Sequence, residues 1–392
     1  MNNAPKEIDG AEVSRQRGLG SSWKYIAEEV CHVTPRKLFE WRRSSGYVEP
    51  RVIPTDEVLR DAVLHIKRRQ PLIGDTILMA QLTNPAYYNF HLPRQRLRDL
   101  MAAIDPVGRD LRRRRLVYRR RVPKVRPMWC AHVDGHHKLD FVKLCIHGMI
   151  DGFSRKVLFL WCSNNNSAHT VLDLYYEASL VHGVPEKLYT DFGGENNGAG
   201  KFQVAVRENP ESWKKVKSTT NVRIERFWAD MQAKVVAYYC ILFTLYEERN
   251  NINCRHVPVH QFVIHFLFIP LINENLCECR DSWNNHKVRT CNNLTPNQMF
   301  DRHENRALRV DPADERIIQI RASLEHDYGQ KSITAFPCPL TAQEYDQFIL
   351  EIVPFRMRDD EAIYLPRIFL AFDVIQRMFE ARPLGLFPLF PF

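Results

Sequence analysis

The pattern from Trp129 onward constrains the fold most, because strand-like segments follow one another there and then alternate with helices. Three strands joined by tight turns are indicated by "WCAHVDGHH", "VKLCIHGMID" and "KVLFLWC". The segments that follow are an amphipathic helix over 167–183, "EKLYTDFG" (strand), "GKFQVAVRE" (helix), "WKKVKST" (strand) and a long helix over 222–247. We therefore expect an antiparallel meander and then two further strands, each followed by a helix.

The order β-β-β-α-β-α-β-α predicts an α/β fold of the ribonuclease H-like type, a five-stranded mixed sheet with flanking helices. In that topology the first and fourth strands are parallel neighbours, so Asp134 in the first strand and Asp191 at the end of the fourth should converge. The carboxyl end of a strand is where such folds usually place their chemistry. Gly193 and Gly194 come soon after Asp191 and allow a close approach of backbone to substrate.

A third carboxylate, Glu225, lies in the first turns of the long helix, which begins "NVRIERFWADMQAKVV". The apolar stripe of this helix consists of Ile224, Phe227, Trp228, Met231 and Val235. Glu225 borders the stripe that docks on the sheet, so it should reach the two aspartates.

Three converging carboxylates favour a two-metal site. Two divalent ions about 3.5 to 4 Å apart can activate a water or a 3′-hydroxyl on one side of a phosphodiester and stabilise the leaving oxygen on the other. Mg²⁺ and Mn²⁺ prefer such oxygen ligands. We expect two Mg²⁺ or Mn²⁺ ions and no small-molecule cofactor, with Asp134 bridging the ions and Asp191 and Glu225 each holding one.

Other interpretations of these residues stay open. The aspartates could be turn residues, and Glu225 could be an acid favoured by the helix dipole. A zinc site built on His132, Asp134 and His136, which alternate along one strand, is a further alternative. We expect Asp151 to be structural, and we expect the later histidines to be polar edges of helices, namely His256, His260 and His265.

A basic block precedes the strands. Between Arg94 and Arg126 the chain has thirteen Lys or Arg residues against three Asp, within an overall net charge of +9. This block should neutralise phosphates, and the arginines expected to do so are Arg112, Arg113, Arg114, Arg115, Arg119, Arg120 and Arg121. A solvated linker or a nuclear-targeting run is the alternative.

Two helical units precede the basic block. In the first, Thr34 as a cap and Pro35 after it predict the second helix of a helix-turn-helix. Arg36 and Lys37 would face the major groove, and Arg42 with Arg43 would reach phosphates; an ordinary helical hairpin is the alternative. The expected segments are 1–50 (helix-turn-helix), 51–104 (second helical unit), 105–128 (basic linker), 129–305 (catalytic core) and 306–392 (C-terminal helical extension).

The remaining features concern the compartment. The ten cysteines form no zinc-knuckle or disulfide pattern, which favours reduced thiols. The first residues lack a signal-peptide pattern, and we expect a nuclear protein if the source is eukaryotic. The apolar run over 257–272 is interrupted by polar residues and prolines, so we expect a buried helix and no membrane span.

From Trp129 to Phe300 the chain resembles retroviral-type integrases and DDE transposases, specifically the integrase-core proteins of eukaryotic transposon-derived genes. The matching motifs are "WCAHVDGHHKL", "IHGMIDGFSR", "TDFGGEN", "NVRIERFW" and "WNNHKVRTCNNLTPNQMF". The resemblance implies that Asp134, Asp191 and Glu225 are the family's metal-binding and catalytic triad. It further implies DNA as the partner and assembly as a homo-oligomer.

The sequence departs from retroviral integrases at two places. No Cys-x-x-Cys pair for a zinc module precedes residue 129. After Glu225 the turns that carry DNA-gripping lysines in that family offer Ala229 and Gln232, with Arg223, Arg226 and Lys234 as substitutes. The function expected is a polynucleotidyl transferase that integrates DNA by two-metal transesterification. The alternatives are a domesticated, non-catalytic DNA-binding regulatory protein and a structure-specific nuclease.

Overall fold

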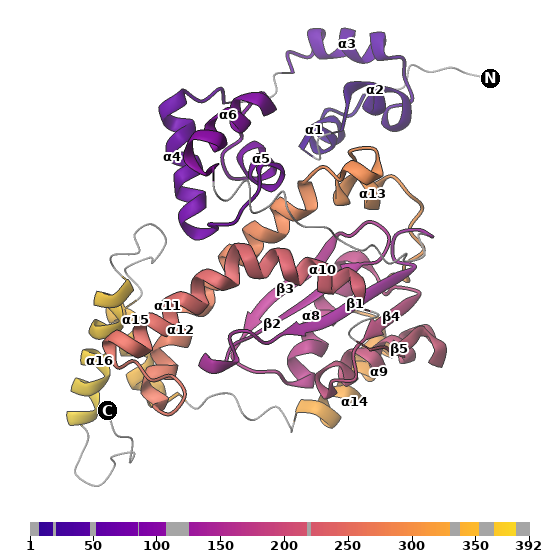
Figure 1. Cartoon of the computed structure of the whole chain (residues 1–392). Helices are drawn as coiled ribbons and strands as arrows, with labels where there is room; N and C mark the ends of the chain where they lie inside the picture. Colours follow the sequence, from indigo (N-terminus) through magenta and orange to yellow (C-terminus); the bar gives the residue numbers. More distant parts are fainter. Residues whose placement is uncertain are drawn as a thin grey trace. The chain divides into compact units, whose positions relative to one another are not determined.

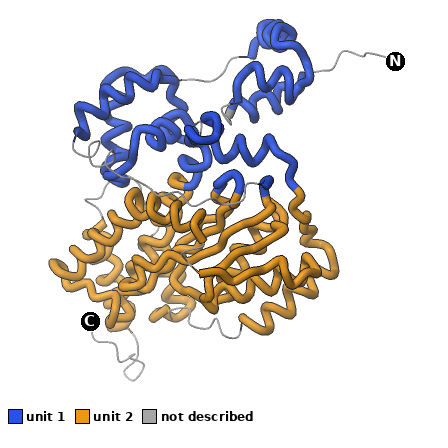
Figure 2. The backbone as a smooth tube through the Cα atoms, turned by 45° about the vertical axis from the view of Figure 1, so that its right-hand side comes forward, with its two compact units in different colours: residues 1–127, 153–156, 280–305 blue, residues 128–152, 157–279, 306–392 orange. Residues whose placement is uncertain are grey.

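The computed structural model describes residues 8–18, 21–47, 52–84, 86–106, 125–217, 221–329, 338–352 and 364–381. The chain forms two compact units (Figure 2). The first contains residues 1–127, 153–156 and 280–305, and the second contains residues 128–152, 157–279 and 306–392. Residues 280–305, expected at the end of the core, thus share a unit with the N-terminal helices.

The second unit is built on a five-stranded sheet in the order β3-β2-β1-β4-β5 (Figure 1). Its strands are β1 (Cys130–His136), β2 (Cys145–Asp151), β3 (Val157–Ser163), β4 (Lys187–Thr190) and β5 (Trp213–Lys215). β1 and β3 each pair antiparallel with β2, whereas β4 pairs parallel with both β1 and β5. The fold is therefore the ribonuclease H-like arrangement predicted from the order of elements.

Helices pack along this sheet. The bounds are α8 (Ala168–His182), α9 (Asn197–Arg207), α10 (Val222–Met231), α11 (Ala237–Asn250) and α12 (Pro258–Asn285). α8 packs on β3, α9 on β4 and β5, and α10 on β1 and β2. Every residue of β2 is buried, as expected for a strand inside a covered sheet, while β5 at the edge exposes its two lysines. Short 3-10 turns are η2 (Asp140–Val142), η3 (Gly194–Asn196) and η4 (Pro210–Ser212).

Two helices differ in detail from the prediction. The long helix over 222–247 is interrupted between α10 and α11 by a π-helical turn, η6 (Gln232–Val236). Its predicted apolar stripe is buried throughout. In α8, predicted as an amphipathic helix over 167–183, the apolar side chain of Val181 in the last turn is 67% exposed.

The apolar run at 257–272 begins α12, which continues for 28 residues and contains Pro270. Among the described helices it alone is long and apolar enough to cross a membrane, with a mean hydropathy of 1.3 over its best window, and 67% of that window is buried inside the protein. Phe268 contacts Tyr364, and Phe262 and Phe266 contact Phe348. The expected buried helix is confirmed, although the helix is longer than the run predicted.

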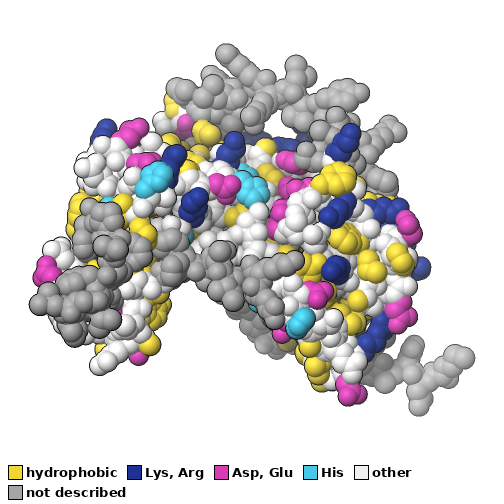
Figure 3. All heavy atoms as spheres, turned by 90° about the horizontal axis from the view of Figure 1, so that it is seen from below, with side chains coloured by type: hydrophobic (Ala, Val, Ile, Leu, Met, Phe, Trp, Pro, Cys, Tyr) yellow, Lys and Arg dark blue, Asp and Glu magenta, His cyan; other side chains and the backbone are white. Residues whose placement is uncertain are grey.

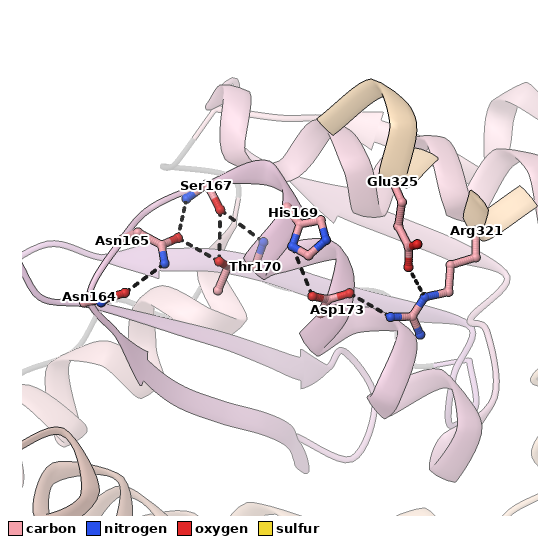
Figure 4. Close-up of polar contacts among 8 residues, drawn as sticks. All are labelled: Asn164, Asn165, Ser167, His169, Thr170, Asp173, Arg321 and Glu325. Atoms are coloured by element: carbon pink, nitrogen blue, oxygen red, sulfur yellow. Dashed lines mark hydrogen bonds and ion pairs between the residues drawn. The ribbon is translucent and has the colours of Figure 1, made fainter. Parts of the chain in front are cut away.

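The C-terminal region contributes α14 (Glu315–Gly329), α15 (Ala342–Ile352) and α16 (Tyr364–Glu380). All three lie within the C-terminal helical extension expected over 306–392, of which residues 330–337, 353–363 and 382–392 lie outside the described part. The sequence had not indicated a helix at α14. It docks on α8 and α9, where Arg321 pairs with Asp173 at 3.0 Å and with Glu325 at 2.6 Å (Figure 4).

The first unit consists mainly of helices. Their bounds are α1 (Gly10–Gly18), α2 (Trp23–Tyr25), the π-helical turn η1 (Ile26–Val30), α3 (Pro35–Ser44), α4 (Asp56–Arg69), α5 (Asp75–Thr83), α6 (Arg94–Ile104), η7 (Arg289–Cys291) and α13 (Pro296–Asp301). Thr34 caps α3 as predicted, and Thr55 caps α4. A small core that includes Val13, Ile26 and Leu38 joins α1 to α3, whereas the sequence had not indicated α1.

The second unit should be acid-labile through His147. This side chain is buried in β2, contacts the Ser163 hydroxyl at 3.0 Å, and burial lowers its pKa from 6.5 to about 4. In the unfolded chain His147 takes up a proton near pH 6.5, whereas in the folded chain it does so only near pH 4. The free energy of unfolding therefore decreases as the pH falls through this interval. At pH 5 the loss from this one group is about 2 kcal/mol.

Urea unfolding at pH 7 and pH 5 checks this expectation. His147→Gln should lose about 2 kcal/mol less on acidification than the wild type. His326→Gln, at an exposed position, serves as the control and should lose as much as the wild type. An equal loss in all three proteins would contradict the role of His147.

Candidate active site

Asp134 lies in β1 and faces α10. Its Oδ2 accepts a hydrogen bond of 2.8 Å from Nε1 of Trp228, and the Gly135 backbone N–H bonds the same carboxylate. His136, two residues further along the strand, packs against Trp228 with ring centroids 5.4 Å apart and the ring planes tilted by 53°. Asp134 is thus a partly buried carboxylate held by two neutral donors.

Asp191 follows β4 directly and is held by its own loop. Its Oδ1 accepts from the Gly193 N–H at 3.0 Å and from Nδ2 of Asn196 at 2.8 Å. The same amide lies 3.4 Å from Oε1 of Glu195, so a buried asparagine bridges two carboxylates. A Cβ at position 193 would lie 2.2 Å from Glu195 Oε1, so a side chain there would require the Glu195 carboxylate to move.

Glu225 is in the first turn of α10, and the residues around it attach that turn to the sheet. Asn221, buried ahead of the helix, accepts from Nδ1 of His132 at 2.6 Å and donates to the Val133 carbonyl at 3.4 Å. Arg223 donates to the Gly152 carbonyl at 2.9 Å. The start of α10 is therefore tied to β1 and to the end of β2, and this fixes where Glu225 emerges.

The three carboxylates influence one another electrostatically. Burial raises the pKa of Asp134 from 3.8 to about 7, and the nearby charges of Asp191 and Glu225 add to the rise, against the lowering effect of the Trp228 bond. Partial desolvation, and then the charge of Asp191, raise the pKa of Glu225. The fold thus brings the three predicted carboxylates within electrostatic range of one another.

A divalent cation is the group that such a site implies. The donor chemistry fits, because carboxylate oxygens are hard ligands and their repulsion favours a shared positive charge. In the part of the chain that the structure describes, no three His, Cys, Asp or Glu side chains already form a group that could hold a metal ion. Asp191 in particular directs one oxygen to its own loop.

The histidines of β1 have other partners. His132 binds Asn221 and stacks on Tyr189, and burial lowers its pKa to about 4. His136 is hydrogen-bonded to Gln232. Of the later histidines, His265 binds the Val142 carbonyl and His260 accepts from the Asn253 N–H. These contacts give the histidines structural roles, and none of them provides a zinc site among the described residues.

Asp151 is structural, as expected: it is fully buried and accepts a hydrogen bond from the Met128 N–H at 2.8 Å.

The residues expected to touch DNA near α10 differ from one another in burial and in their partners. Lys234 is only 6% exposed, so its burial does not support a surface contact with DNA. Arg223 bonds the Gly152 carbonyl, and Arg226 pairs with Asp230 at 3.2 Å on the exposed side of α10.

Basic residues of the first unit are better exposed. Arg36, Lys37 and Arg43 are exposed on α3, with Arg36 pairing with Glu40 at 3.0 Å. Arg42 instead stacks on the Trp23 ring at 4.8 Å. The seven arginines of the basic block between 112 and 121 lie outside the described residues. On the face drawn in Figure 3, basic and acidic side chains are interspersed.

Residues that the sequence did not single out as part of the site are Asn196, Asn221, Trp228 and Glu195. Asn196 and Glu195 are in "TDFGGEN" and Asn221 opens "NVRIERFW", so their motifs were noticed without their roles. Trp228 was assigned to the apolar stripe alone. Its indole N–H was the available signal, since a buried tryptophan usually finds an acceptor.

Comparison with known proteins agrees with this fold. Residues 117–310 match the model of the integrase core domain family. Among solved structures, a chain of a cryo-EM structure of a simian T-cell lymphotropic virus intasome in complex with PP2A regulatory subunit B56 gamma is 16% identical. The likeness covers 64% of this chain and 76% of that chain, with a TM-score of 0.36. No curated protein matches the chain.

Removing the Asn221 side chain should loosen the start of α10. Asn221→Ala leaves the buried His132 Nδ1 without its partner, and we expect a loss of about 1–3 kcal/mol in the free energy of unfolding. Amide hydrogen exchange over 221–226 should become faster. A stability within about 0.5 kcal/mol of the wild type and unchanged exchange would contradict the anchoring role.

Proposed function

We propose that the protein is an integrase-like polynucleotidyl transferase that cuts and joins DNA strands by transesterification at a phosphodiester. The integrase core domain supplies the reaction class, since members of this family are usually polynucleotidyl transferases. Asp134, Asp191 and Glu225 are proposed as the catalytic residues and as the ligands of two Mg²⁺ or Mn²⁺ ions. The reaction uses water or a 3′-hydroxyl as the nucleophile, with no covalent enzyme intermediate.

The observation that supports this proposal most is the electrostatic coupling of the three carboxylates. Burial raises the pKa of Asp134 in β1 to about 7, and the charges of two other acids raise it further: Asp191, which follows the parallel neighbour β4, and Glu225 on α10, which packs on β1 and β2. A chain that needed only turn residues or helix-dipole acids would gain nothing from placing them within range of each other. The coupling favours a shared cation site over those structural interpretations.

The chain's own groups have separate tasks in this mechanism. Bound divalent ions would activate the nucleophile and stabilise the leaving oxygen. Trp228 and Gly135 orient the Asp134 carboxylate, Asn196 holds the Asp191 loop, and Asn221 sets the start of the helix that carries Glu225. Both loop bonds of Asp191, from Gly193 and Asn196, go to Oδ1, so Oδ2 would be the oxygen that this residue offers to a metal ion.

The second candidate function is a domesticated DNA-binding regulatory protein without catalysis. It is favoured by the finding that the described residues present no ready-made group of three metal ligands. The two functions differ in one measurable respect, which is metal-dependent chemistry on DNA.

Asp191→Asn and Glu225→Gln should each abolish Mg²⁺- or Mn²⁺-dependent nicking and strand transfer on labelled duplex DNA. Each change removes a charge from the proposed ligands while preserving side-chain shape, and we expect activity to fall at least about 10³-fold. Glu211→Gln is the matched control, because Glu211 is an exposed acid paired with Lys214. Activity retained in either triad variant would remove that residue from the mechanism.

Full DNA binding without metal-dependent cleavage by the wild type, on substrates that include candidate terminal sequences, would instead favour the regulatory function.

By the same proposal the active form is a nuclear homo-oligomer on DNA, since joining two DNA ends requires more than one active site to be held together. The oligomer would be detected by light scattering with and without DNA.

The basic block is proposed to grip DNA phosphates, on the strength of its charge. Replacing its seven arginines between 112 and 121 by glutamine should weaken duplex binding and flatten its dependence on salt. A slope of about 0.9 in log K against log[salt] is lost for each phosphate contact removed. Fluorescence anisotropy between low and physiological salt measures both quantities. A variant with unchanged affinity and slope would exclude the block from the interface.

A further inference from the structure

The ring of Trp228 packs against the sheet at Gly148, in the space that a side chain at position 148 would fill. In the register of β1 and β2, Asp134 lies opposite Gly148. A Cβ on Gly148 would be 2.6 Å from Trp228 Cη2 and 3.4 Å from Leu160 Cδ1. A glycine within a buried strand costs stability, and here it allows the indole to lie against β2 beside Asp134.

The indole is fixed from several sides. Trp228 is 5% exposed, and its ring lies 5.4 Å from His136 and 5.6 Å from Phe227. With the ring held in this way, Nε1 points at Asp134 Oδ2 at 2.8 Å. An indole N–H is a donor only, so the carboxylate of Asp134 is held in one orientation by a group whose nitrogen does not compete for the metal ion.

The neutrality of this donor also matters. A lysine or arginine in its place would orient the carboxylate but would cancel the negative charge that attracts a cation. Trp228 lies three residues after Glu225, so the two side chains are neighbours on the surface of α10. One helical turn therefore delivers both a carboxylate of the proposed site and the group that orients another.

We propose that Trp228 is a positioning residue: its indole N–H, seated over Gly148, fixes the Asp134 carboxylate in the orientation that receives a divalent cation. This inference rests on the proposed function, because it assumes that Asp134 is a metal ligand. It assigns to the Trp228–Gly148 pair a role in metal affinity that is separate from packing of the core.

The test measures binding of Mn²⁺ alone to the full chain, by electron paramagnetic resonance of free Mn²⁺, together with nicking as a function of Mn²⁺ concentration. Trp228→Phe keeps an aromatic ring and removes the N–H. We expect it to weaken Mn²⁺ binding about 10–100-fold, to slow nicking at limiting Mn²⁺, and to recover most of the activity at saturating Mn²⁺. Trp161→Phe on β3, where the side chain is 44% exposed, is the control and should bind Mn²⁺ like the wild type.

Gly148→Ala tests the other half of the pair. Its methyl group must displace the indole, so it should weaken Mn²⁺ binding by a similar factor, and the double variant should be no weaker than the weaker single variant. If Gly148→Ala does not fold, as judged by thermal unfolding, Trp228→Phe decides alone.

Asp134→Asn separates the two possible failures. If it abolishes Mn²⁺ binding while Trp228→Phe keeps wild-type affinity, the positioning role is overturned and the proposed function stands. If Asp134→Asn leaves Mn²⁺ binding intact, Asp134 is not a ligand, and the proposed metal site fails together with the inference built on it.

Discussion

The parallel pairing of β1 with β4 is the constraint on which the candidate site depends. It aligns Cys130, Ala131 and His132 with Lys187, Leu188 and Tyr189, so the carboxyl end of β4 opens beside the second half of β1. Asp134 and Asp191 come from positions 57 residues apart along the chain, and this pairing alone brings them together. α10 then needs only to start at the right place, which the Asn221 contacts with β1 provide.

The two aspartates of the candidate site are held by different kinds of contact. Asp134 is oriented by a buried indole and a backbone amide, whereas Asp191 is satisfied by its own loop through Gly193 and Asn196. Repulsion among the carboxylates opposes their closer approach until a cation compensates it.

Much of the core could be predicted from the sequence, because its information is local. The alternation of strands and helices, the Thr34 and Thr55 caps and the stripe of α10 all depend on neighbouring residues. What could not be predicted depends on distant partners. α14 is stabilised by Arg321 against Asp173, 148 residues away, and α1 by a small core shared with α3. The burial of Lys234 and the bond from Trp228 to Asp134 likewise follow only from how α10 seats on the sheet.

The close packing of Trp228 on Gly148 has an evolutionary consequence. While the indole is present, nearly every substitution at position 148 collides with it, so the glycine is protected from drift. A descendant that lost the tryptophan would release position 148 to acquire side chains, and each of these would then bar the return of the indole. Once both positions have changed, no single substitution restores the Trp228–Gly148 contact. We therefore expect the loss of this pair to be difficult to reverse.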